Sequence, residues 1–107
     1  WTCPTHFYVD AFSHSDTDQL KRQLQQKKLS ISCISPRQSC PNPFHLAAKD
    51  KDMIRHTKNY FQQVVYSAHE LEASRILITS GWSFNDEPKV EAWKRSVSLC
   101  KWLCHFA

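Results

Sequence analysis

The residue types with the most obvious chemistry are six histidines and five cysteines. Cys100 and Cys104 lie one helical turn apart and His105 follows, so metal binding is the first hypothesis to weigh. However, the chain has no CxxC pair and lacks the second half of a zinc ligand set. Both thiols also fall in an apolar helical stripe, which favours packing in the core. We therefore expect no metal ligands in this chain.

Three further side chains could contact a small hydroxylated ligand: Ser80, Trp82 and His45. Ser80 and Trp82 follow a predicted strand, and His45 lies in the proline-rich loop after another. An indole or imidazole there could wall off a sugar and hydrogen-bond its hydroxyls. Two plainer interpretations stay open. Trp82 could pack as a rim residue on a neighbouring loop, and His45 could satisfy the backbone of its own loop.

The elements that would position these side chains alternate along the sequence. Helices are predicted over residues 16–28, 50–71 and 88–106, and strands over 30–35 and 75–80. Asp50 is placed to cap the second helix, and Pro88 suits the first turn of the third. A strand–helix–strand unit of this length implies parallel strands joined by a right-handed crossover. The expected fold class is therefore α/β, in an α-β-α-β-α order.

Two helices carry apolar rows that should face a core. On the second helix the inward row steps by three and four residues: Ile54, Thr57, Phe61, Val64, Val65, Ala68 and Leu71. On the third helix the predicted inward row is Val90, Trp93, Val97, Cys100 and Cys104, widened by Leu99, Trp102, Leu103 and Phe106.

Length and charge restrict the class of protein. A chain of 107 residues predicts one domain over 1–107. Its net charge of +4 is spread over two helices, which is typical of solvated helix faces and predicts no nucleic-acid partner. No apolar run is long enough to predict a membrane span. An odd number of cysteines with a single glycine favours reduced thiols and a cytoplasmic location.

Four segments together resemble a known family: PNPFHLAA at 41–48, ILITSGW at 76–82, DEP at 86–88 and EAWKR at 91–95. They are similar to the sugar (phosphate) isomerase/epimerase family with the xylose-isomerase-like TIM barrel, and most closely to its fructoselysine 3-epimerase-like branch. The resemblance covers nearly all of the chain. A complete (β/α)8 barrel needs about 250 residues, so the resemblance implies a partial barrel from the N-terminal half.

The resemblance also implies a reaction and a cofactor. Family members move a proton next to a carbonyl in a sugar or sugar phosphate, using paired glutamates and a divalent metal, Mn, Co or Mg. Those groups lie on later strands, so this segment is expected to hold no catalytic residue and no metal, and to be inactive alone. Glu87 and Glu91 are interpreted as helix-start charges.

A second hypothesis is a non-catalytic α/β module that binds a protein partner through its open sheet. If the chain is a partial barrel, its unpaired strand edges and the 102–106 surface also favour self-association. One departure from the family stands out. A glycine commonly ends the second helix there, whereas this chain has Glu72, so either the helix ends differently or some strain is tolerated.

Overall fold

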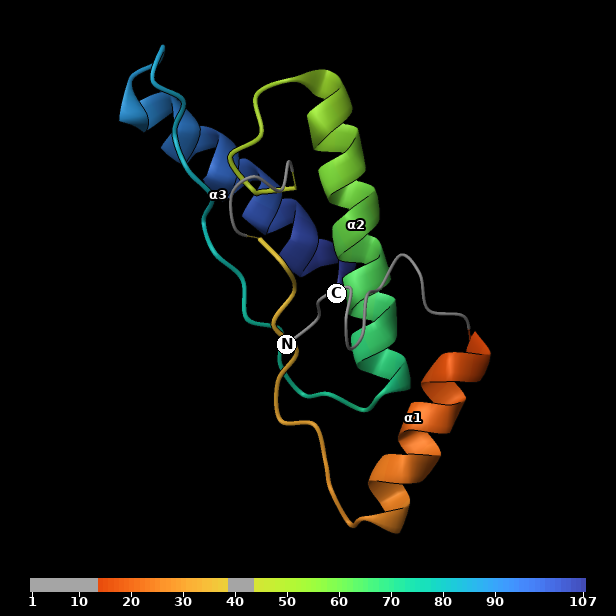
Figure 1. The fold of residues 1–107 in the computed structure, drawn as a ribbon. Helices are drawn as coiled ribbons and strands as arrows, with labels where there is room; N and C mark the ends of the chain where they lie inside the picture. The colour runs from red at the N-terminus through yellow and green to blue at the C-terminus, as the bar shows by residue number, and fades with distance from the viewer. Residues whose placement is uncertain (1–13, 39–43) are drawn as a thin grey trace. The chain divides into compact units, whose positions relative to one another are not determined.

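Helices account for nearly all of the regular structure in the described part of the chain. The computed structural model describes residues 14–38 and 44–107. These residues form α1 (His14–Gln26), α2 (Lys51–Glu70) and α3 (Lys89–Phe106), which Figure 1 shows in chain order. Each begins and ends within two residues of its predicted bounds, so the helix predictions are confirmed. None of these helices is both long and apolar enough to cross a membrane.

Local side-chain and backbone chemistry explains where two helices begin. The Asp50 carboxylate accepts hydrogen bonds from the amides of Asp52 at 2.8 Å and Met53 at 3.2 Å, satisfying two free donors of the first turn of α2. Pro88 precedes α3 with φ −64° and ψ 136°, an extended conformation that its ring favours. Both helix starts could be predicted from the sequence, because each depends only on residues that are neighbours along the chain.

The ends of α1 and α2 adopt the left-handed conformation without glycine. Lys28 has φ 53° and Glu72 has φ 56°. The amides beyond them close the helices, Leu29 donating to the Leu24 carbonyl and Ala73 to the Ala68 carbonyl, each at 2.9 Å. Glu72 therefore takes the position that glycine would favour, and it tolerates the strain.

The expected α/β class, a partial (β/α)8 barrel with parallel strands at 30–35 and 75–80, is wrong. Within 14–38 and 44–107 there is no strand, so the described chain is all-helical. One isolated bridge, parallel in sense, joins Ile34 to Ile76. Two hydrogen bonds form it: the Ile34 amide donates to Arg75 at 2.9 Å, and the Leu77 amide to Ile34 at 2.8 Å.

The reason lies in what a parallel ladder requires. A pair of strands alone is marginal, and parallel sheets are normally covered on both faces. Here Leu77 remains 59% exposed beside the bridge, and Ser32 and Cys33 are also exposed. An alternating apolar and polar sequence therefore does not become a strand, because nothing within the described residues continues the ladder.

The chain divides into two compact units, and α2 contributes to both. Of the described residues, one unit contains 14–37 and 63–77, and its buried residues are Thr17, Ile34, Pro36, Val64, Ala68 and Leu71. The other contains 38–62 and 78–107, where Leu46, Tyr60 and Phe61 are among the most buried. Burying each of the larger apolar side chains contributes about 1.5–3 kcal/mol. The predicted inward row of α2 is mostly confirmed: Ile54 and Val65 are half-buried, and the other five members are buried.

The predicted inward row of α3 is wrong in its five main members, although Leu99 and Leu103, which were predicted to widen it, are buried. The buried residues of this helix are Ala92, Ser96, Leu99 and Leu103. Val90 is 55% exposed, Trp93 64% and Val97 36%, while Cys104 is exposed and Cys100 half-buried. Helix α3 has apolar residues on more than one side, and the side with two small residues is the one that is buried.

Candidate functional site

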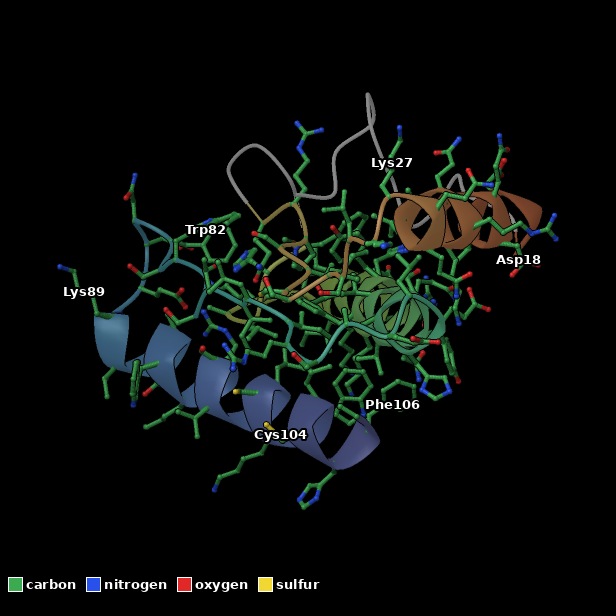
Figure 2. The ribbon with its side chains drawn as sticks, turned by 90° about the horizontal axis from the view of Figure 1, so that it is seen from below. Asp18, Lys27, Trp82, Lys89, Cys104 and Phe106 are labelled. Atoms are coloured by element: carbon green, nitrogen blue, oxygen red, sulfur yellow. The ribbon has the colours of Figure 1, made fainter. Side chains whose placement is uncertain are left out.

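A small pocket opens beside the first turns of α3, within the second unit. Its volume is about 160 Å³. Three serines, two tryptophans, a lysine, two alanines and a glycine line it: Ala47, Ser80, Gly81, Trp82, Ser83, Lys89, Ala92, Trp93 and Ser96. Two of the three predicted site residues, Ser80 and Trp82, therefore line one cavity. Figure 2 labels Trp82 and Lys89.

His45 lies against Trp82 and is not among the lining residues. Its ring stacks on the indole with centroids 3.8 Å apart and planes 21° from parallel, and Phe84 lies at 5.9 Å. The side chain is fully buried, and neither ring nitrogen has a hydrogen-bond partner within the described residues. His45 thus supports one face of Trp82. Its predicted contact with a ligand stays a prediction.

The environment of His45 keeps the ring neutral at neutral pH. Burial lowers the pKa of His45 below its ordinary value of 6.5, because a charged ring in this place would lack the water that stabilises it in solution. The positive charge of Arg95 lowers this pKa further.

Gly81 allows the loop to approach the His45 ring closely. Its φ is 85°, a conformation that residues with a Cβ rarely adopt. A Cβ built there would lie 2.8 Å from the Nδ1 of His45 and 2.9 Å from the amide nitrogen of Ala47. The only glycine of the chain therefore serves two purposes, the turn and the close packing beneath Trp82.

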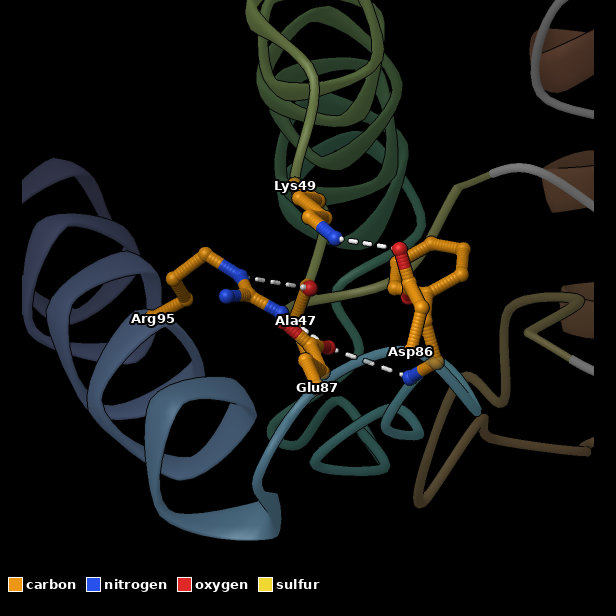
Figure 3. A network of polar contacts seen from close by, with 6 residues as sticks. Ala47, Lys49, Asp86, Glu87 and Arg95 are labelled. Carbon is orange, nitrogen blue, oxygen red and sulfur yellow. Dashed lines mark hydrogen bonds and ion pairs between the residues drawn. The ribbon is translucent and has the colours of Figure 1, made fainter.

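A polar network fixes the loop between Trp82 and α3 (Figure 3). One Oε1 of Glu87 accepts from the Phe84 amide at 3.0 Å and from a terminal nitrogen of Arg95 at 2.5 Å. The Nε of Arg95 donates to the Ala47 carbonyl at 3.1 Å. The bond from Arg95, and then that from Phe84, lowers the pKa of Glu87. Arg95 thereby ties α3 to both loops that form the site.

A second, exposed ion pair joins the same two loops. The Nζ of Lys49 lies 2.9 Å from a carboxylate oxygen of Asp86, and 5.9 Å from the centre of the Phe84 ring. The Asp86 side chain is 71% exposed, so solvent and salt screen this pair.

The sequence alone did not identify Lys89, Trp93 and Ser96 as members of this site. The available signal was the small residue Ala92 followed four positions later by Ser96, which marks the face of α3 that the rest of the unit can approach closely. The larger apolar residues Val90, Trp93 and Val97 lie on the exposed face.

A shallow cationic groove of about 360 Å³ lies elsewhere in the same unit. Its lining is Lys51, Ile54, Arg55, Lys58, Asn59, Gln62 and Trp102. Lys58 sits 4.9 Å from the centre of the Trp102 ring, and Arg55 pairs with Asp52 at 3.0 Å. Because two of its cations already have partners, we interpret this groove as an ordinary solvated helix surface.

Within residues 14–38 and 44–107, no three histidine, cysteine, aspartate or glutamate side chains are grouped to hold a metal ion. The pocket instead offers hydroxyls, an ammonium group and aromatic faces, which suit binding and orientation of a polar ligand. No family model, curated protein or solved structure matches this chain.

Proposed function

We propose that this chain is the sugar-binding segment of a metal-dependent sugar or sugar-phosphate isomerase/epimerase, and that the sugar binds in the pocket beside Trp82. The observation that carries the proposal is the convergence of Ser80 and Trp82 on one cavity with Lys89. An indole offers a sugar an apolar face, and serine hydroxyls can exchange hydrogen bonds with its hydroxyls. The proposal rests on this pocket and on the resemblance of the sequence, and it no longer involves a barrel.

Lys89 suggests which sugars bind best. Lys89 is a lining residue of the pocket and the first residue of α3, where the helix N-terminus also favours negative charge. A phosphorylated sugar should therefore bind more tightly than its neutral counterpart. The proton transfer next to the carbonyl, and the Mn, Co or Mg ion that the family uses, are assigned to parts of the enzyme outside this chain. A cytoplasmic location accords with phosphorylated substrates and free thiols.

The direct test is a titration with a ketose and with its phosphate, followed by chemical shifts of the backbone and indole N–H groups. Trp82→Ala should weaken binding of both sugars. Lys89→Gln should weaken only the phosphate and bring its affinity to that of the neutral sugar. Lys94→Gln is the matched control, because Lys94 pairs with Glu91 on the exposed side of α3. Absence of shifts around Trp82 at millimolar sugar would overturn the proposal.

A second candidate function is binding of a protein partner through α3. Val90, Trp93 and Val97 form an exposed apolar row with spacings of three and four residues, which suits contact with another helix. This row replaces the open sheet as the expected surface, since the described residues have no sheet. Val97→Glu should abolish concentration-dependent association in light scattering while leaving sugar binding intact, which separates the two candidates.

A further inference from the structure

The outward row of α3 also carries two thiols. Cys100 and Cys104 follow Val97 along the helix, both thiols are free, and Cys104 is exposed (Figure 2). Residues four positions apart on a helix are neighbours on its surface. Cys100 is half-buried beside its partner, so a small ion could reach both sulfur atoms from solvent.

The second thiol affects the chemistry of the first. Burial, followed by the neighbouring Cys104, raises the pKa of Cys100. Cys100 is therefore a protonated thiol at neutral pH, and a ligand that needs its thiolate must displace the proton.

Helix geometry favours an ion bridge over a disulfide. The Cβ atoms of residues four apart are separated by about 5–6 Å, whereas a disulfide needs about 3.5–4.5 Å. Closing a disulfide would therefore distort the last turns of α3. Two metal–sulfur bonds of about 2.3 Å each can span sulfur atoms up to about 4.6 Å apart, which the undistorted helix can provide.

We propose that Cys100 and Cys104 form a two-thiolate binding site for a soft monovalent cation, Cu(I). Zinc prefers four ligands, and no third ligand is grouped with this pair in the described residues. Cu(I) is soft, favours thiolates and accepts two of them in a nearly linear arrangement. Binding breaks two S–H bonds and forms two Cu–S bonds. Both protons pass to the buffer, and copper stays in the same oxidation state.

The test uses the full chain with Cys3, Cys33 and Cys40 replaced by serine, so that only the proposed pair remains. Cu(I) is titrated without oxygen against a coloured Cu(I) chelator, and circular dichroism checks that the helices are kept. We expect one Cu(I) per chain. Either Cys100→Ser or Cys104→Ser should weaken binding by at least about a hundredfold, because the second thiol acts at high effective concentration.

A spacing control keeps the number of thiols and changes only their placement. In the three-serine background, Cys104→Ser combined with Ser98→Cys puts the two thiols on different sides of α3 and should bind as weakly as a single thiol. In the otherwise unchanged chain, the double change Cys100→Ser and Cys104→Ser should remove one equivalent of bound Cu(I). Equal affinity in the spacing control, or one Cu(I) shared by two chains, would overturn the proposal.

Discussion

The imidazole of His45 lies flat against the indole of Trp82, with ring centroids 3.8 Å apart and planes 21° from parallel. His45 is followed by three more buried residues, Leu46, Ala47 and Ala48, so the ring belongs to a tightly packed segment. Trp82 on the other side lines the pocket. The stack therefore links the best-packed loop of this unit to its candidate binding surface.

Acid should destabilise the protein through His45. Its pKa is lowered on folding, so the unfolded chain binds the proton more readily. The stability contribution of the neutral ring is fully present above the ordinary pKa of 6.5 and is lost as the pH falls below it. We expect urea unfolding midpoints to decrease from pH 7 to pH 5. This group should lower the free energy of unfolding by at most about 1.4 kcal/mol per pH unit.

The matched variant for that measurement is His45→Phe, which keeps a ring against Trp82 and cannot be protonated. Its stability should change less between pH 7 and pH 5 than that of the unchanged chain. Glu72, Asp86 and Glu87 also have lowered pKa values, but they change the stability only at lower pH, around and below their ordinary pKa values of 4.5 for glutamate and 3.8 for aspartate. An identical pH dependence in the variant would assign the effect to other groups.

Gly81→Ala should be among the more damaging single changes in the second unit. A residue with a Cβ at φ 85° is strained by about 1–2 kcal/mol, and the added methyl would meet His45 and Ala47 at under 3 Å. We expect a lower thermal midpoint and a loss of the ring-current shifts that the His45–Trp82 stack produces. Ser80→Ala, one residue away and exposed, is the control for stability and should change the midpoint little.

Glu72→Gly should stabilise the chain. Glu72 ends α2 with φ 56°, where glycine avoids the left-handed penalty of about 1–2 kcal/mol at some cost in chain entropy. The change also removes an exposed ion pair with Lys21 at 2.6 Å, and such pairs contribute little. We expect a net gain of about 0.5–1 kcal/mol in the free energy of unfolding.

The control for that gain is Glu72→Ala, which loses the same ion pair and keeps the backbone strain. It should be neutral or slightly destabilising. Lys28→Gly tests the same relationship at the end of α1, where φ is 53°. Equal stability of the alanine and glycine variants at position 72 would show that the left-handed conformation costs no more than the extra chain entropy of glycine.

Glu87→Gln should loosen the loop that precedes α3. The amide oxygen can still accept from the Phe84 N–H group and from Arg95, but the negative charge that pairs with Arg95 is lost and that bond is weaker. We expect a lower unfolding midpoint and faster hydrogen exchange of the Phe84 amide. Asp86→Asn is the matched control, because it removes a charge from the neighbouring, exposed pair with Lys49. A larger effect from the control would place the main support of the loop in the exposed pair.

Sequence by itself determined the features that depend on neighbouring residues. The Asp50 cap, the proline before α3 and the inward row of α2 were all predicted, because capping and helical periodicity are local properties. Trp82 and Ser80 were chosen because they follow a predicted strand, and they share one pocket although no strand forms there. His45 was predicted to contact a ligand from the loop after the other strand. It is instead buried against Trp82 and does not line the pocket.

Only the tertiary structure decided which face of α3 is buried and whether the alternating segments pair. Helix α3 has apolar residues on several sides, so periodicity could not distinguish the row of Ala92 and Ser96 from the row of Trp93 and Val97. Residues 30–35 and 75–80 share a single bridge between Ile34 and Ile76. Strand formation depends on hydrogen-bonding neighbours that are distant in the sequence, whereas a helix satisfies its own backbone. This difference explains why every helix was predicted and neither strand formed.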